Sequence, residues 1–281
     1  MPASRPHTLA APGATLYYET CGTGPLLLII PGGPQDAGVF ADLAAHLGNR
    51  YTVLAFDPRG NSRTTTDAEP GALDVDLLAD DAAALISANG GGPAFVFGTS
   101  GGGQIGLSLA ARHPDHVATL VAHEPPTIML LPDPEPALAG ERALHETYKR
   151  DGVEAAMGQF FAENGLDGDD SEGPPDFDMP PEAAETFARV SGNFEYWLAH
   201  GMLPLSTYQP RLDTLRSGAP RIIVAIGEQS AGQPIEAMSQ ALAAALNITP
   251  TPFPGDHMGF ETDAAGFADA LDRAFKETRH G

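Results

Sequence analysis

Apolar runs of strand length alternate along this chain with amphipathic stretches of helix length. The run Pro25–Ile30 is almost wholly apolar, which is typical of a central strand covered on both faces. Strands are predicted at Thr15–Thr20, Pro25–Ile30, Tyr51–Phe56, Phe95–Phe97, Val117–Ala122, Arg221–Ile226 and Ile248–Phe253. Helices are predicted at Val39–Leu47, Asp74–Ala88, Gly102–Arg112, Ile235–Leu246 and Ala264–Lys276. This alternation predicts an α/β fold with a mostly parallel central sheet and helices on both faces.

The alternation stops between Thr127 and Pro210, where short helix-like pieces and proline-rich joints replace the strands. We therefore expect a core domain formed by residues 1–126 and 211–281, with a helical cap (lid) subdomain at 127–210. The acidic loop Asp167–Glu172 in this region resembles a calcium loop only loosely. It lacks the glycine and the distal glutamate at EF-hand spacing, so a solvated loop is the better interpretation.

Length and charge restrict the class of protein. The 281 residues suffice for one large α/β core with an insertion. The formal net charge of −22 argues against nucleic-acid and anionic-membrane partners, since both would be repelled. A single cysteine, Cys21, excludes an internal disulfide, and no signal-peptide or membrane-spanning run is present. We expect a soluble cytoplasmic protein, a monomer or a homodimer.

The segment Gly98-Thr99-Ser100-Gly101-Gly102 directly follows an apolar strand and precedes a predicted helix. A serine flanked by glycines at ±2, at a strand-to-helix turn, has the pattern of a nucleophile elbow. The sharp turn exposes the serine hydroxyl above the sheet, and glycines let the neighbouring backbone pass close by. Ser100 is therefore the predicted nucleophile.

The predicted base is His257, in the glycine-bounded segment Pro254–Gly259 between the last strand and the last helix. Such a loop can place an imidazole over the carboxyl end of the sheet, where it can activate a serine. Seven other histidines are better interpreted as surface or packing residues, because they are terminal (His7, His280), lie in or after covering helices (His46, His113, His116) or belong to the predicted cap (His145, His200).

The acid that orients His257 has two candidates. Glu124 follows the strand Val117–Ala122 and preserves the chain order serine, acid, histidine. Glu228 lies after the next strand, in Gly227-Glu228-Gln229-Ser230. In the α/β-hydrolases, which the Ser100 segment resembles, the position of Ser230 usually holds an aspartate. We favour Glu124 and keep Glu228 as the alternative. Asp256, the neighbour of His257, is expected to shape the loop.

The oxyanion hole is expected from the backbone N–H groups of Gly101, directly after the nucleophile, and Gly33, in the turn Pro31–Pro34. Asp57, which ends a strand on the same rim, is expected to brace a turn. The sequence Gly101–Gly106 also matches the dinucleotide fingerprint G-x-G-x-x-G. Because several strands precede it and Ser100 lies in its turn, close packing of a helix on a strand explains these glycines better.

With these motifs the chain resembles the α/β-hydrolase superfamily, and within it the zearalenone-type lactone hydrolases. The resemblance rests on Gly22–Pro25, Pro31–Gly33, Phe56-Asp57 with Ser62-Arg63, the Ser100 elbow and His123–Thr127. It implies that the triad acid is Glu124 and that Trp197, in Asn193–Trp197, lines the substrate cleft. Trp197 as a packing anchor of the cap is the alternative. The Gly-Gly-Pro oxyanion turn and the long acidic loop Leu166–Pro181 depart from that family.

These residues predict a serine hydrolase that cleaves an apolar ester or lactone and needs no cofactor or metal. Substrate-binding residues are expected among the apolar residues of the cap: Trp197, Met129 and Phe194, with Leu130, Phe160, Phe161, Phe187 and Met202. The same set can instead form the cap's own core. The competing hypotheses are a non-hydrolytic enzyme of the same fold, such as a lyase, perhydrolase or cofactor-independent oxygenase, and a non-catalytic ligand-binding relative.

Overall fold

The computed structural model describes residues 4–69, 71–164, 180–217 and 220–277. The acidic loop at 167–172 lies outside the described residues. Within them, no helix combines the length and the apolar character needed to cross a membrane.

A single mixed sheet forms the centre of the molecule, with strand order β1-β2-β4-β3-β6-β7-β8-β9. The antiparallel strands β1 and β2 lie at one edge, and all pairs from β4–β3 to β8–β9 are parallel. The strands are β1 (Arg5–Ala11), β2 (Ala14–Gly22), β3 (Leu26–Ile30), β4 (Thr52–Phe56), β5 (Thr65–Thr66, paired with β2), β6 (Ala94–Thr99), β7 (Val117–His123), β8 (Arg221–Gly227) and β9 (Thr251–Phe253). The predicted α/β fold with a mostly parallel sheet is confirmed.

The central strands are apolar along their length because each one contributes side chains to two cores. In β3, Leu28 and Ile30 belong to the core on one face, and Leu27 and Ile29 to the core on the other. This alternation is the two-residue period of a strand covered on both sides. The first core contains residues of α2, α3 and α9, and the second contains residues of α1, α10 and α11.

Helices cover both faces of the sheet. They are η1 (Ala37–Phe40), α1 (Ala41–Leu47), α2 (Val75–Ala88), α3 (Gly101–Arg112), η2 (Pro114–His116), η3 (Ile128–Leu130), α8 (Leu212–Arg216), α9 (Pro234–Leu246), α10 (Gly259–Thr262) and α11 (Ala264–Lys276). The five predicted ones, here α1, α2, α3, α9 and α11, lie close to their predicted positions, whereas the shorter η2, η3, α8 and α10 were not predicted. Asp74 begins α2 by accepting hydrogen bonds from the N–H groups of Asp76 and Leu77.

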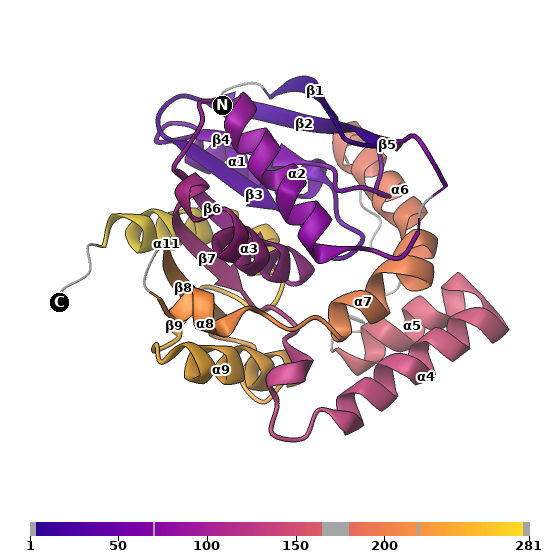
Figure 1. Ribbon diagram of the computed structural model, residues 1–281. Coiled ribbons are helices and arrows are strands. Elements are labelled where there is room, and N and C mark those ends of the chain that lie inside the picture. Colours follow the sequence, from indigo (N-terminus) through magenta and orange to yellow (C-terminus); the bar gives the residue numbers. More distant parts are fainter. Residues whose placement is uncertain (1–3, 70, 165–179, 218–219, 278–281) are drawn as a thin grey trace.

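A group of helices lies between β7 and β8 in the chain and gathers at one side of the molecule (Figure 1). We call them the inserted helices: α4 (Glu135–Asp151), α5 (Val153–Glu163), α6 (Pro181–Tyr196), the π-helical turn η4 (Trp197–Gly201) and α7 (Met202–Ser206). Their buried residues form a separate apolar cluster: Leu144, Ala156, Met157, Trp197, Leu198 and Met202.

The sheet order reverses beside β3, which lies between β4 and β6. From β3 the chain passes outward to β4, then crosses back to β6 on the other side. In parallel sheets, ligands bind at the carboxyl ends of the strands where the order reverses in this way. Here that position lies between the turn after β3 and the residue after β6, which is Ser100.

Candidate active site

Ser100 occupies the sharp turn between β6 and α3, with φ 52° and ψ −126°. A positive φ is uncommon for a residue other than glycine and marks a strained backbone. Its N–H donates to the carbonyl of His123, at the end of β7, over 2.8 Å. The turn is possible because residue 98 is a glycine: a Cβ at this position would lie only 2.3 Å from the Gly102 oxygen. Ser100 is thus presented at the carboxyl edge of the sheet, as the elbow pattern predicts.

Glu124 is the first residue after β7 and is fully buried. One carboxylate oxygen lies 2.7 Å from His257 Nδ1, and the other accepts the N–H of Gly227 over 2.8 Å. The backbone of Glu124 also has a positive φ, 44°. Both oxygens are therefore fixed, and one of them orients the imidazole of His257.

The surroundings of Glu124 favour its charged form. Burial raises the pKa of this carboxyl group, but the hydrogen bond to His257 and the electrostatic influence of the neighbouring imidazoles together lower it by more. The buried Ser230 acts in the same direction. The net pKa of Glu124 lies below its usual range, so the group stays a carboxylate near neutral pH.

Glu228, the alternative acid, does not reach His257. Its side chain is exposed, and its N–H donates to the carbonyl of Phe253. The structure thus brings Glu124, and not Glu228, to the predicted base. Ser230 is buried close to Glu124, because the strands that precede these two residues, β8 and β7, are neighbours.

His257 lies in the loop between β9 and α10, with 18% of its side chain exposed. Asp256 shapes this loop by accepting the N–H of Met258 over 2.8 Å, as expected. No hydrogen bond joins the Ser100 hydroxyl to the His257 ring among the described contacts. In hydrolytic sites this bond is often long without substrate and shortens in the complex.

The backbones of Gly33 and Gly101 lie close together. A Cβ built on Gly101 would lie 3.4 Å from the Gly33 nitrogen. Neither N–H has an acceptor among the hydrogen bonds of the described residues. Two unpaired donors beside a serine elbow are the arrangement that an oxyanion hole requires.

His123 is a neighbour of this site that the sequence did not single out. It is fully buried, its Nδ1 lies 3.0 Å from the Thr99 hydroxyl, and its ring stacks on that of His257 at 6.1 Å. Burial lowers the pKa of His123 to about 3, and the nearby Glu124 only partly opposes this. His123 is therefore neutral and supports the site by packing.

Comparisons with known proteins show the family to which this chain belongs. The family model described as the alpha/beta hydrolase fold matches residues 25–261. This chain belongs to that family. The hydrolase is 31% identical over 278 residues to a protein of Bacillus subtilis (strain 168) called uncharacterized hydrolase YraK, with 97% of each chain covered.

Two solved structures show the same fold. A thermophilic esterase from Thermogutta terrifontis is 21% identical, with a TM-score of 0.73 and 98% of each chain covered. The enol-lactonase from Burkholderia xenovorans LB400 is 17% identical, with a TM-score of 0.68 and coverage of 96% of this chain and all (100%) of that one. At these identities the likeness shows the fold alone.

The apolar residues predicted to bind substrate are divided between several places in this hydrolase. Trp197 and Phe194 pack in the cluster of the inserted helices, and Met129 is half-buried in η3. Phe187 points into solvent instead, with 65% of its surface exposed. Much of the set is therefore the core of the inserted helices, which was the alternative interpretation.

Trp197 is also the member of this set that approaches the oxyanion turn. Its indole nitrogen lies 3.4 Å from the position that a Cβ on Gly33 would take. Trp197, Gly33, Gly101 and Leu205 line a cavity of about 10 Å³, roughly the room of one water. No group of three or more His, Cys, Asp or Glu side chains in the described ranges is placed to hold a metal ion.

Proposed function

We propose that this hydrolase cleaves a carboxylic ester or lactone of a small apolar molecule through a Ser100–His257–Glu124 triad. The observation that carries the proposal is the 2.7 Å contact between His257 Nδ1 and Glu124 Oε2. It lies at the sheet edge where the Ser100 elbow also ends. A serine, an imidazole and a buried carboxylate in these roles form the constellation of acyl-transfer enzymes on several folds.

In the first step the Ser100 oxygen attacks the carbonyl carbon of the substrate while His257 Nε2 takes the hydroxyl proton. The carbonyl oxygen becomes an oxyanion that accepts hydrogen bonds from the N–H groups of Gly33 and Gly101. Glu124 stabilises the imidazolium and holds the proton on Nδ1. When the tetrahedral intermediate collapses, His257 gives its proton to the leaving alcohol, and an acyl group stays on Ser100.

In the second step water replaces the alcohol. His257 takes a proton from the water, the hydroxide attacks the acyl carbon, and Ser100 leaves with the proton. An ester yields a free acid and an alcohol. A lactone yields one hydroxy acid, because its alcohol and acyl groups belong to the same ring.

The inclusion of a lactone among the proposed substrates rests on the resemblance to zearalenone-type lactone hydrolases, which covers the His123–Thr127 segment and the elbow. The fold does not decide it, since related folds carry both an esterase and an enol-lactonase. We further propose that residues 127–210 act as a cap. With the cavity beside the oxyanion turn as small as one water, a substrate of several carbons needs the inserted helices to move.

The matched pair Glu124→Gln and Glu228→Gln tests the proposed triad. Glutamine keeps the size of both side chains and removes the charge that orients His257. On a p-nitrophenyl ester we expect Glu124→Gln to lower kcat by a factor of about 10² to 10⁴ and Glu228→Gln to change it less than about twofold. Normal activity in Glu124→Gln, or a loss in Glu228→Gln, would contradict the proposed acid. Activity that survives in Ser100→Ala would contradict the mechanism.

A further inference from the structure

The turn that carries the Gly33 N–H, residues 31–36, is held on one side by the core. Asn61 donates from one amide nitrogen to the carbonyls of Gly33, over 3.0 Å, and Gln35, over 2.9 Å. The Gln35 side chain accepts the N–H of Gly32 over 3.0 Å. These bonds fix the backbone of the turn and leave the Gly33 N–H unpaired among the described hydrogen bonds.

The opposite side of the turn is bound by α6, one of the inserted helices. Asn193 is 5% exposed and donates from Nδ2 to the Pro34 carbonyl over 2.7 Å and to the Ser62 hydroxyl over 2.9 Å. Its Oδ1 accepts the Ser62 N–H over 2.8 Å. One amide side chain thus joins α6 to the residue directly after Gly33 and to the loop that contains Asn61.

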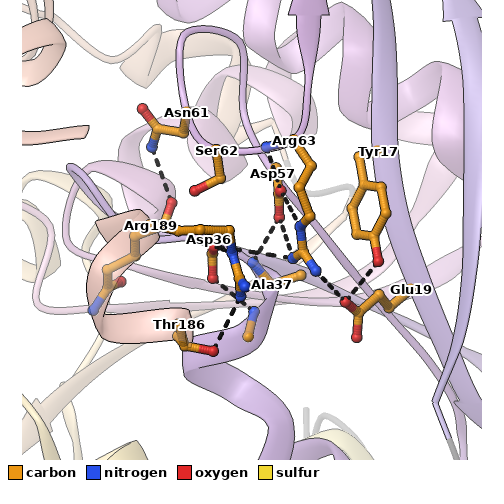
Figure 2. A network of polar contacts seen from close by, with 12 residues as sticks. Tyr17, Glu19, Asp36, Ala37, Asp57, Asn61, Ser62, Arg63, Thr186 and Arg189 are labelled. Atoms are coloured by element: carbon orange, nitrogen blue, oxygen red, sulfur yellow. Dashed lines mark hydrogen bonds and ion pairs between the residues drawn. The ribbon is translucent and has the colours of Figure 1, made fainter. Parts of the chain in front are cut away.

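An ion pair one turn earlier in α6 adds a second connection. Arg189 Nε donates to Asp36 Oδ2 over 2.6 Å, and Asp36 is fully buried at the end of the oxyanion turn. Asp36 Oδ1 accepts the Gly38 N–H and so begins η1. Figure 2 shows Arg189 and Thr186 on α6 facing Asp36, beside the pairing of Asp57 with Arg63.

These contacts lie close to an N–H whose position matters for catalysis. Gly33 has a positive φ of 40°, so its peptide is held in a conformation that only the surrounding bonds fix. Oxyanion donors must lie within a few tenths of an ångström of their working position. Loss of the Asn193 bond to the Pro34 carbonyl, or of the Arg189 bond to Asp36, would let the backbone that follows Gly33 move.

We propose that Asn193 and Arg189 are positioning residues that hold the Gly33 N–H in the oxyanion hole. The inference rests on the proposed function. It adds that α6 positions the transition-state machinery through two contacts distant in sequence. Asn193 and Pro34 are 159 residues apart, and Arg189 and Asp36 are 153 residues apart. Movement of α6 away from the core then also disorders the oxyanion hole.

The test compares Asn193→Ala and Arg189→Gln with Arg142→Gln as the matched control. Arg142 lies in α4 and pairs with Glu135 on the surface, away from the oxyanion turn. For each variant, kcat and KM are measured on an ester, together with the rate at which a fluorophosphonate reacts with Ser100. Hydrogen–deuterium exchange of peptides covering residues 31–40 is measured on the same samples.

We expect Asn193→Ala to lower kcat and the phosphonylation rate in parallel, by about 10- to 100-fold, with KM changed less than about threefold. This is less than complete loss of an oxyanion donor, which costs about 10²- to 10³-fold. Arg189→Gln is expected to lower kcat and the phosphonylation rate by about 3- to 30-fold. Asp36→Asn keeps the acceptor for the Gly38 N–H and is expected to give a loss of the same size. The double variant Arg189→Gln/Asp36→Asn should lose no more than either single variant, because both changes break the same ion pair. Exchange of residues 31–40 rises in these variants and not in Arg142→Gln.

Unchanged exchange in the turn, or a loss that falls on KM alone, would overturn the inference. Failure of the proposed function gives a different result. The wild-type protein would then show neither turnover nor an adduct on Ser100, while exchange in Asn193→Ala still decides whether α6 holds the turn.

Discussion

Two residues of the proposed triad, Ser100 and Glu124, have a positive φ although neither is glycine. Each such conformation costs on the order of 1–3 kcal/mol, and it persists only where neighbouring contacts fix it. The Ser100 N–H bonds to the carbonyl of His123, and the Glu124 N–H bonds to the carbonyl of Ala225. The strain at both positions is therefore balanced by bonds to adjacent strands, and both side chains leave the sheet edge in the direction that the chemistry needs.

His123 makes folding stability depend on pH. Its folded pKa of about 3 lies below the ordinary value of 6.5, so the unfolded chain binds the proton more readily. Stability from this residue is present above pH 6.5 and is lost as the pH falls toward 3, by about 1.4 kcal/mol per pH unit. In His123→Gln we expect the drop in unfolding free energy between about pH 6 and pH 4 to be smaller by about 2–3 kcal/mol. Urea unfolding at the two pH values measures it.

The exposed residue His46 provides the control for that experiment. His46→Gln is expected to keep the pH dependence of the wild type. A His123→Gln protein with the same pH dependence as the wild type would show that His123 is not buried in its neutral form.

The placement of Ser100, Glu124 and His257 at one edge of the sheet was predictable at the residue scale, because each follows a strand whose end the apolar pattern locates. His123 was not. Its burial depends on Phe97, Phe253, Phe260 and Phe267, which pack around its ring from four separate elements. Asn193 and Arg189 were missed as partners of the oxyanion turn for the same reason, since nothing local indicates which distant backbone an amide or a guanidinium will meet.

At the scale of elements, α3 lies directly against β3 because its first turn has no side chains. A Cβ on Gly102 would lie 2.1 Å from the carbonyl oxygen of Ile30. This confirms the interpretation of the Gly101–Gly106 glycines as packing residues. The close approach brings the helix that follows Ser100 next to the strand that leads into the oxyanion turn.

Gly102→Ala and Gly140→Ala form a matched pair that tests this packing. Alanine at Gly102 forces α3 away from the Ile30 carbonyl, and we expect a loss of about 3 kcal/mol or more. Gly140 lies on the exposed side of α4 with nothing within 4 Å of a Cβ. There alanine is expected to stabilise by about 0.5–1 kcal/mol through helix propensity. Denaturant unfolding of both variants measures the difference, and equal effects would contradict the close packing.

The buried strands and most covering helices were predictable because their apolar period is strong. Strand β1 was missed because most of its residues are exposed on both faces, so no apolar alternation marks it. The predicted strand Ile248–Phe253 is shorter in the structure, Thr251–Phe253, with Pro250 at its start. The π-helical turn at Trp197–Gly201 has no distinct period in sequence and was not expected.

At the scale of the whole molecule, the net charge of −22 acts against compaction. Buried carboxylates such as Asp57 and Asp81 are paired with arginines, but acidic residues far outnumber basic ones, since the chain has 37 Asp and Glu and 15 Lys and Arg. Salt screens repulsion between exposed charges over about 10 Å at 0.1 M. It affects the buried pairs much less.

We therefore expect sodium chloride to stabilise this hydrolase. Raising its concentration from about 10 mM to about 500 mM should raise Tm by a few degrees, because the repulsion is screened more than the buried ion pairs are. Thermal unfolding monitored by circular dichroism measures the shift. A Tm that falls with salt would mean that the surface ion pairs outweigh the repulsion.

The central claim is that Ser100 is a nucleophile activated by its surroundings, and intact-mass labelling with a fluorophosphonate tests it most directly. The reagent phosphonylates an activated serine and leaves ordinary hydroxyl groups unmodified. The account predicts one adduct on the wild-type protein, mapped to Ser100, and none on folded Ser100→Ala. No adduct on the folded wild-type protein, or an adduct at another residue, would contradict it.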